Sequence, residues 1–296
     1  MQKIRGLFLK ASVKSQSAME YLMTYGWAIL IIAIVLAALF SLGVFSPTAY
    51  TPKASPGSCQ VFRPDGPGTT SFINLEGICN GELPQYVAQF NGVSTYVEMS
   101  QIPSSTLGAN AKTVAAWIYP TSYSGEDGIV VTGPSGGGST GQSFRFVINS
   151  NGQLGLDVSD GIAYTSLVAP LNKWSFVVAT YYNNNYLVYL QATSQSLSLP
   201  VQNLVQGYIY IGFNFINNYY FSGSIANVQI YNTALSSNDI QALYQEGIGG
   251  APINLQNLVG WWPLNSNTND YSGNDNNGVA SGVTYSSSWY SGYTPS

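Results

Sequence analysis

The segment Asn172–Leu190, NKWSFVVATYYNNNYLVYL, decides the fold of this chain. Apolar and polar residues alternate on both sides of a cluster of asparagines, and alternation with a period of two is typical of a half-buried β-strand. Asparagine clusters between such runs indicate turns. The segment therefore predicts two strands, Trp174–Tyr181 and Tyr186–Gln191, joined as a hairpin.

Working outward from this hairpin, similar short runs fill the chain from Tyr86 to Tyr231, separated by clusters of Gly, Asn, Ser and Pro. Many short strands with almost no helical pattern predict an antiparallel sandwich or barrel. The one convincing helix is Ser236–Glu246, which begins with a serine and stops at Gly247. The other predicted strands are Tyr86–Phe90, Thr95–Met99, Thr113–Tyr119, Gly128–Thr132, Phe144–Asn149, Gly152–Val158, Tyr208–Phe213 and Ser224–Tyr231.

The order of these pieces resembles a laminin G-like, concanavalin A-like jelly roll. FNGVSTYVEM (Phe90–Met99) is similar to the opening strand pair of that family, and TVAAWIYP (Thr113–Pro120) to its central strand. The hairpin of Asn172–Leu190 and the segment Phe221–Tyr244, a closing strand, turn and short helix, follow in the same order. The resemblance implies a mainly β fold, with an antiparallel β-sandwich head over residues 59–296.

The carboxy-terminal segment, residues 258–296, is unusual in its position. Its part Leu258–Val283 looks like the element that usually begins this fold. Two interpretations follow: a circular permutation, in which the segment completes the sandwich, or the start of a truncated second repeat. We favour permutation because too few residues remain for another sandwich, and because Trp261 and Trp262 would otherwise be exposed to water at a large hydrophobic cost.

The amino-terminal region contains an apolar run, WAILIIAIVLAALFSLGVF, over Trp27–Phe45. Together with Tyr21–Gly26 it is long enough to cross a bilayer as a helix. A secretory signal peptide or signal anchor is the alternative. However, a secretory signal has its cleavable small-residue element after the apolar run, whereas here a polar element precedes it.

That polar element, KSQSAMEYLMTYGWAIL over Lys14–Leu30, resembles the class III signal peptide of archaeal type IV pilins and archaellins. The resemblance implies that a prepilin peptidase cuts between Ser15 and Gln16. Residues 1–15 would then be a cleavable leader, and residues 16–45 a long hydrophobic helix for assembly. The helix would lie in the membrane before assembly and pack with other copies of the chain in an extracellular filament afterwards.

Glu20 would be the fifth residue of the cleaved chain. A carboxylate at the head of an apolar helix is costly unless it is paired or lies at the membrane interface. In a bundle of identical chains, the free α-amino group of a neighbour could neutralise it. The alternative is an interfacial residue with no partner.

Between helix and head, residues 46–58 are rich in Pro and small polar residues, which predicts a semi-rigid extended linker. Residues 59–84 contain the only two cysteines, Cys59 and Cys79. An exported location permits a disulfide between them, which would stabilise the chain by roughly 3 kcal/mol. Two free buried thiols are the alternative.

Composition excludes some functions. Nine Lys and Arg face thirteen Asp and Glu, without any basic patch, so we expect no nucleic-acid partner. The chain has no His and no E-x-D-x-x-E pattern of the kind that supplies the paired carboxylates of related glucan-cleaving enzymes. We therefore expect no catalytic residues.

The segment Asn269–Gly278 packs oxygen-bearing side chains around glycine turns, as a calcium ion requires. Asp270, Asn274 and Asp275 are the candidate ligands, and calcium is the one cofactor that we consider. The alternative is an ordinary turn rich in Asn and Asp.

Carbohydrate binding is suggested by the fold resemblance and by 22 tyrosines, several beside asparagines. The candidates are Tyr181, Tyr182, Tyr219 and Tyr220; the alternative is that these tyrosines simply form good strands. Taken together, the sequence predicts a type IV pilin-like surface filament subunit whose lectin-like head adheres to glycans or cell-surface partners. The alternative is a membrane-anchored, non-polymerising lectin-like surface protein.

Overall fold

The computed structural model describes residues 25–37, 59–63, 71–75, 83–107, 111–133, 143–158, 161–199 and 207–293. The chain divides into two compact units, Met1–Lys53 and Ala54–Ser296.

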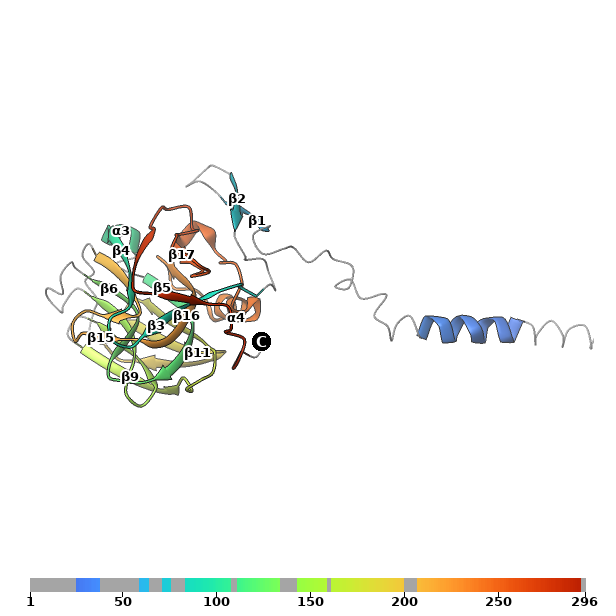
Figure 1. The fold of residues 1–296 in the computed structure, drawn as a ribbon, viewed down its shortest axis with the longest axis horizontal. Coiled ribbons are helices and arrows are strands. Elements are labelled where there is room, and N and C mark those ends of the chain that lie inside the picture. Colours follow the sequence, from blue (N-terminus) through green and yellow to red (C-terminus); the bar gives the residue numbers. More distant parts are fainter. Residues whose placement is uncertain are drawn as a thin grey trace, which may run out of the picture. The chain divides into compact units, whose positions relative to one another are not determined.

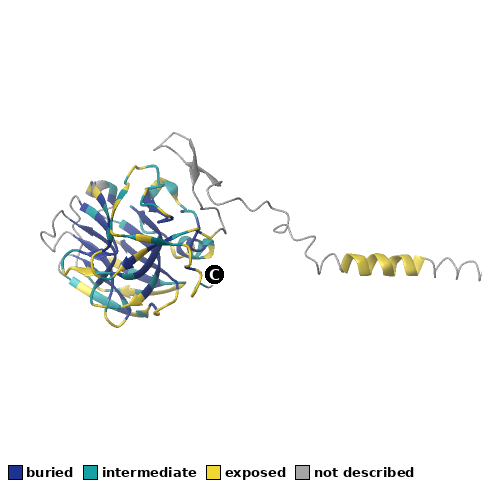
Figure 2. Cartoon of the chain, in the orientation of Figure 1, coloured by how far each residue is buried: buried dark blue, intermediate teal, exposed yellow. Residues whose placement is uncertain are grey.

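In the first unit, residues 25–37 form a helix whose side chains are all exposed, among them Trp27 and Ile34 (Figure 2). Among the described residues, no helix combines the length and the apolar character that crossing a bilayer demands. In place of the predicted long apolar helix over residues 16–45, the described residues show a short helix over 25–37, and residues 16–24 and 38–45 lie outside the described part.

The second unit contains two large antiparallel sheets (Figure 1). The first is eight-stranded, in the order β12 (Thr193–Leu197), β11 (Asn185–Leu190), β10 (Ser175–Tyr182), β5 (Ala111–Ser122), β16 (Ser222–Tyr231), β3 (Val87–Asn91) and β19 (Thr284–Ser286), with β17 (Leu258–Trp262) also paired to β16. The second is seven-stranded, in the order β18 (Gly278–Ser281), β4 (Tyr96–Ile102), β13 (Gly207–Ile211), β6 (Asp127–Gly133), β7 (Phe144–Ile148), β8 (Gln153–Val158) and β9 (Gly161–Val168). The predicted mainly β, antiparallel sandwich is confirmed.

Smaller elements are also present among the described residues of this unit. The pairs β1 (Cys59–Arg63) with β2 (Ser71–Leu75), and β14 (Phe213–Asn214) with β15 (Tyr219–Tyr220), are two-stranded, and the helices are α3 (Ser104–Leu107), α4 (Ser237–Glu246) and η3 (Leu255–Asn257).

The main core lies between the two sheets, because alternate residues of each strand face inward. From the eight-stranded sheet come Val114 and Val177, and from the seven-stranded sheet Phe146 and Ile209, all fully buried. A second apolar cluster covers the outer face of the eight-stranded sheet, where Trp117 packs together with Ile240 and Leu243 of α4. Figure 2 shows most strand residues of both sheets as buried.

Local sequence explains the central hairpin and the helix. Asn183 and Asn184 connect β10 to β11 with φ of 45° and 66°, the left-handed geometry that a two-residue type I′ turn requires. Helix α4 begins after Ser236, whose hydroxyl accepts a hydrogen bond from the backbone N–H of Asp239 while the Asp239 carboxylate binds the N–H of Ser236.

The carboxy-terminal tail contributes to both sheets. Its strand β17 pairs with β16, β18 with β4, and β19 with β3. Trp261 and Trp262 are fully buried. The side-chain oxygen of Asn227 in β16 accepts a hydrogen bond of 2.8 Å from the Trp261 indole N–H, which ties the tail to the sandwich.

Candidate functional site

A cleft of about 490 Å³ opens on the outer face of the eight-stranded sheet, where β3, β5, β16 and β19 meet the end of the chain. Its lining consists of uncharged side chains that are aromatic, hydroxyl-bearing or amide-bearing, together with two glycines. They are Gln89, Phe90, Asn91, Thr95, Tyr119, Thr121, Trp174, Gly223, Ser224, Gly282, Thr284, Ser288, Trp289 and Ser291.

The floor of the cleft is a row of four residues in register across four neighbouring strands. Tyr119 of β5 lies opposite Ser224 of β16, Ser224 opposite Gln89 of β3, and Gln89 opposite Thr284 of β19. Directly opposed residues in an antiparallel sheet lie about 5 Å apart on the same face. The row therefore presents a phenol, two hydroxyls and an amide side by side.

The pleat of the sheet directs these side chains outward. In β3, Ala88 and Phe90 are buried in the core between the sheets, whereas the intervening Gln89 is exposed. The exposed amide of Gln89 can donate hydrogen bonds to a ligand and accept hydrogen bonds from it.

Two tryptophans form a wall beside Tyr119. The rings of Tyr119 and Trp174 lie 5.6 Å apart, and those of Trp174 and Trp289 are 5.8 Å apart at an interplanar angle of 87°. The Trp174 indole N–H donates to the backbone carbonyl of Trp289, and the Trp289 indole N–H donates to the carbonyl of Pro84. Both residues are more than nine-tenths buried, and their two indole hydrogen bonds stiffen this side of the cleft.

A second polar row lies at one end of the cleft. The hydroxyls of Thr121 and Ser222 are hydrogen-bonded at 3.0 Å, and Ser222 lies opposite Asn91. The side-chain oxygen of Asn91 accepts hydrogen bonds from the N–H groups of Val93 and Ser94, which fixes the turn after β3.

The tyrosines singled out in the sequence do not form this site, and the structure does not bring them together. Tyr181 is buried between the sheets, stacked on Tyr186 at 4.8 Å, because its position in β10 faces inward. It is therefore not available to a ligand. Its neighbour Tyr182 faces outward and is 55% exposed.

Tyr219 and Tyr220 form β15, which contacts β6 of the opposite, seven-stranded sheet. Tyr220 stacks on Phe213 at 4.5 Å and joins an aromatic cluster that covers part of that sheet. In the same cluster, the Tyr210 hydroxyl donates to the carboxylate of Glu98, and burial together with that carboxylate raises the pKa of Tyr210.

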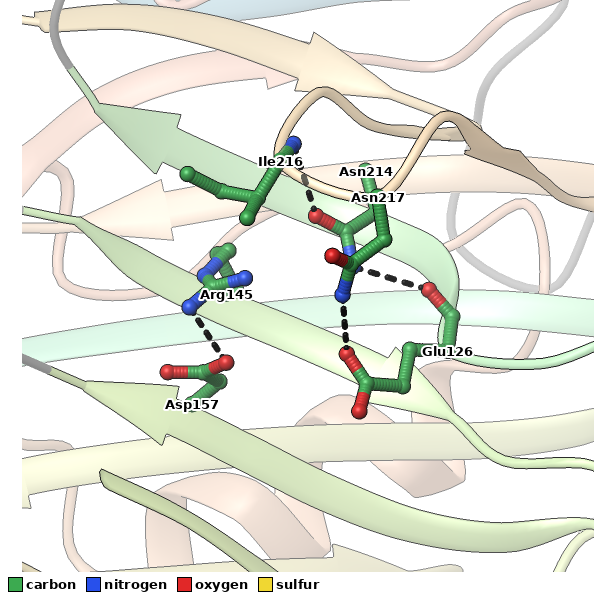
Figure 3. A network of polar contacts seen from close by, with 6 residues as sticks. All are labelled: Glu126, Arg145, Asp157, Asn214, Ile216 and Asn217. Atoms are coloured by element: carbon green, nitrogen blue, oxygen red, sulfur yellow. Dashed lines mark hydrogen bonds and ion pairs between the residues drawn. The ribbon is translucent and has the colours of Figure 1, made fainter. Parts of the chain in front are cut away.

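Beside this cluster, the seven-stranded sheet carries a polar network (Figure 3). Arg145 of β7 and Asp157 of β8 form a buried ion pair. The side-chain amide of Asn217 donates to the Glu126 carboxylate at 2.7 Å, and that of Asn214 donates to the Glu126 carbonyl at 3.0 Å. These contacts hold the β14–β15 hairpin against the sheet, and both carboxylates are already engaged by protein groups.

Asp270 organises the loop in which we predicted calcium. One carboxylate oxygen accepts from the N–H groups of Trp261 and Ser272, and the other from the Ser272 hydroxyl and the Asn276 N–H. Its oxygens are therefore occupied as in an Asx-type turn. The Asn274 amide donates to the carbonyls of Leu258 and Val259.

Within the described residues, no group of three or more His, Cys, Asp or Glu side chains could hold a metal ion. Asp275 is exposed in the same loop, and the occupied oxygens of Asp270 favour the alternative of an ordinary turn rich in Asn and Asp.

The leader, assembly and disulfide residues that the sequence predicts come last. Ser15, Gln16, Glu20 and Cys79 lie outside the described residues, and Cys59 opens β1 with a side chain that is not described. The leader, the assembly contact and the disulfide therefore stay predictions from the sequence.

Sequence reasoning missed the floor of the cleft. Gln89, Ser224 and Thr284 come from three separate strands, and no local motif links them. The available signal was weak: each is a polar residue at an outward position of a strand, a pattern common to every solvated sheet face.

A family model described as the concanavalin A-like lectin/glucanases superfamily matches residues 91–241, just over half of the chain. The chain belongs to this superfamily. The matched residues run from the end of β3 into helix α4, so the superfamily match includes β5 and β16 of the cleft but not the tail strand β19. A search of curated proteins found no match.

Several solved structures are similar to this chain, and one of them, with a TM-score of 0.50, shares the fold. A Bacteroides ovatus protein described as carbohydrate-binding is 15% identical, with a TM-score of 0.50 over 73% of this chain and 66% of that one. A heptameric SAP-like pentraxin from Limulus polyphemus is 16% identical, with a TM-score of 0.48 over 68% of this chain and 94% of that one. The CBM40 of a Ruminococcus gnavus sialidase, bound to α2,3-sialyllactose, is 14% identical, with a TM-score of 0.42 over 54% of this chain and 98% of that one.

Proposed function

We propose that this chain is a surface protein whose β-sandwich head binds glycans in the cleft on the eight-stranded sheet. The observation that carries the proposal is the row Tyr119, Ser224, Gln89 and Thr284, aligned in one cleft beside Trp174 and Trp289. Sugars present hydroxyls in fixed directions and an apolar ring edge, and such a row offers complementary hydrogen bonds next to aromatic carbon.

The size and the relatives of the head support this proposal. The cleft volume falls within the roughly 300–1,000 Å³ of small-molecule pockets. The superfamily description includes lectins, and the Bacteroides ovatus protein that shares the fold is described as carbohydrate-binding. Because a fold hosts many functions, the cleft rather than the fold carries the argument.

The test is a glycan array probed with the full-length chain in mild detergent. We expect binding to a defined subset of glycans and a loss of at least about tenfold in affinity for the double variant Gln89→Ala, Thr284→Ala. Both residues are exposed, so folding should be kept. The matched control changes Thr193 and Ser194 of β12, exposed residues on the same sheet, to alanine. Equal binding by both double variants would place the glycan elsewhere.

We further propose that the head is displayed by a type IV pilin-like amino terminus. The class III-like segment around Ser15 and Gln16 supports processing by a prepilin peptidase. Residues 25–37 carry large apolar side chains, all of them exposed in the isolated chain, and such a surface favours burial in a membrane or against other copies. The protein would then be membrane-inserted as a precursor and part of an extracellular filament afterwards. The alternative is a membrane-anchored lectin-like protein that does not polymerise.

Amino-terminal sequencing of the native protein separates these two. The filament proposal expects Gln16 as the first residue, and it expects Glu20→Ala to abolish filaments seen by electron microscopy while glycan binding by the head is kept. A matched acidic control is Glu246→Ala, at the end of α4 in the head. A native chain that retains Met1 and never forms filaments would support the anchored alternative.

A further inference from the structure

The cleft is uncharged throughout its lining. None of its lining residues is Asp, Glu, Lys, Arg or His, although its walls come from four strands and the tail. The neighbouring Lys173, next to Trp174 in sequence, is exposed and does not line the cleft. A ligand that enters this cleft therefore meets hydroxyls, amides and aromatic edges, and no formal charge.

This neutrality has a consequence for a charged ligand. A carboxylate that leaves water loses several kcal/mol of hydration unless a cation or several N–H or O–H donors replace that water, and each hydroxyl can donate only one hydrogen bond. Within the cleft, the side-chain N–H donors nearest the row are those of Gln89 and Asn91, and the Asn91 amide nitrogen already donates to the Ser94 hydroxyl at 3.2 Å. The two indole N–H groups already donate to Trp289 and Pro84 carbonyls. The chain as a whole is also acidic, at −4, which opposes an approaching anion.

From this geometry we infer that the cleft selects uncharged, hydroxyl-rich glycan ends and rejects glycans whose terminal sugar carries a carboxylate. The inference rests on the proposed glycan-binding function and names the class of ligand for that site. Recognition comes from hydrogen bonds to Gln89, Ser224 and Thr284 and not from ion pairing. Binding should accordingly be insensitive to salt, since salt screens interactions between charges and leaves neutral hydrogen bonds nearly unchanged.

The experiment uses the full-length chain in detergent and an array that pairs neutral oligosaccharides with their sialylated and uronate-bearing counterparts. We expect each bound neutral glycan to lose more than about tenfold in affinity when its terminal sugar gains a carboxylate. Affinity for the neutral glycan should change by less than about twofold between about 0.05 M and about 0.5 M NaCl.

A gain-of-charge variant sharpens the test. Gln89→Lys places an ammonium group in the middle of the row. The ratio of the affinity for the neutral glycan to that for its carboxylate-bearing counterpart should fall by about tenfold. Ser194→Lys adds the same charge to an exposed position of β12 on the same sheet and should leave the preference unchanged. If only carboxylate-bearing glycans bind the unmodified chain, the inference is wrong and the proposed function survives. If no glycan binds, both are wrong.

Discussion

The indole N–H of Trp174 donates a hydrogen bond of 2.9 Å to the backbone carbonyl of Trp289, and the two rings meet edge to face. Trp174 precedes β10 in the middle of the chain, whereas Trp289 follows the last strand. The backbone N–H of Trp174 also donates to the carbonyl of Gly292. This pair therefore fixes the end of the chain against the sheet and forms one wall of the cleft.

Trp289→Ala should disrupt the wall of the cleft that Trp174 and Trp289 form, and it should abolish glycan binding. Only 5% of Trp289 is exposed, and its indole N–H donates to the Pro84 carbonyl. Loss of a large buried aromatic should lower the free energy of unfolding by about 3 kcal/mol, measured by chemical denaturation. Trp289→Phe, which keeps a ring but removes the donor, should cost less than Trp289→Ala. Tyr182→Ala is the control, because Tyr182 is 55% exposed; if it costs as much as Trp289→Ala, the assigned role of Trp289 is wrong.

Lys112 should make the stability of the head depend on pH. Its side chain is fully buried, with its ammonium group 3.4 Å from the Thr132 hydroxyl and 5.1 Å from the centre of the Phe144 ring. Burial lowers the pKa of Lys112 from 10.5 to about 7. Between those values the unfolded chain binds a proton that the folded chain does not, so stability should rise with pH from about 7 towards 10.5.

Lys112→Met should remove this rise and stabilise the head at neutral pH by an amount on the order of a few kcal/mol. The measurement is urea denaturation of the full-length chain between about pH 7 and about pH 9.5, below the range in which tyrosines titrate. Lys173→Met, at an exposed lysine, is the control and should keep the slope. An unchanged slope in Lys112→Met would show that another group causes it.

Gly223 should tolerate no side chain. It has a φ of +135°, and a Cβ there would lie 2.0 Å from the carbonyl oxygen of Tyr119, beneath the floor of the cleft. Gly223→Ala should therefore lower the free energy of unfolding by about 3 kcal/mol and weaken glycan binding. Gly282→Ala is a milder comparison, because its Cβ would meet only the Thr95 methyl group at 3.2 Å and should cost about 1 kcal/mol. Equal costs would argue against the close approach at Tyr119.

Asp270 should stabilise the tail as a hydrogen-bond acceptor. Asp270→Ala leaves the N–H groups of Trp261 and Asn276 without their acceptor and should cost about 2 kcal/mol, whereas Asp275→Ala, at an exposed site, should cost less than about 0.5 kcal/mol. Because both Asp270 oxygens are already occupied, adding calcium or a chelator should leave the melting temperature of the full-length chain unchanged. A rise in melting temperature with calcium, lost in Asp270→Ala, would instead establish the metal site.

Sequence patterns located most strands of the sandwich. The predicted hairpin Trp174–Tyr181 and Tyr186–Gln191 agrees with β10 and β11 to within one residue at each end, because both strands are rich in apolar and aromatic residues and an asparagine turn separates them. The strands that were missed include β9 and β12, whose residues are mostly exposed or half-buried and carry little alternation. These two strands are the edges of their sheets, where one side of the strand faces solvent and hydrophobic patterning is weakest.

The sequence by itself determined the class of the fold, the antiparallel strands and the helix that Ser236 caps, since alternation and capping are local properties of neighbouring residues. Only the tertiary structure decided the site. Whether Gln89 faces Ser224 and Thr284, or whether Tyr181 points inward and Tyr182 outward, depends on strand order and register. Those are set by burial of the whole core across distant segments, and a shift of one residue would turn every side chain to the other face.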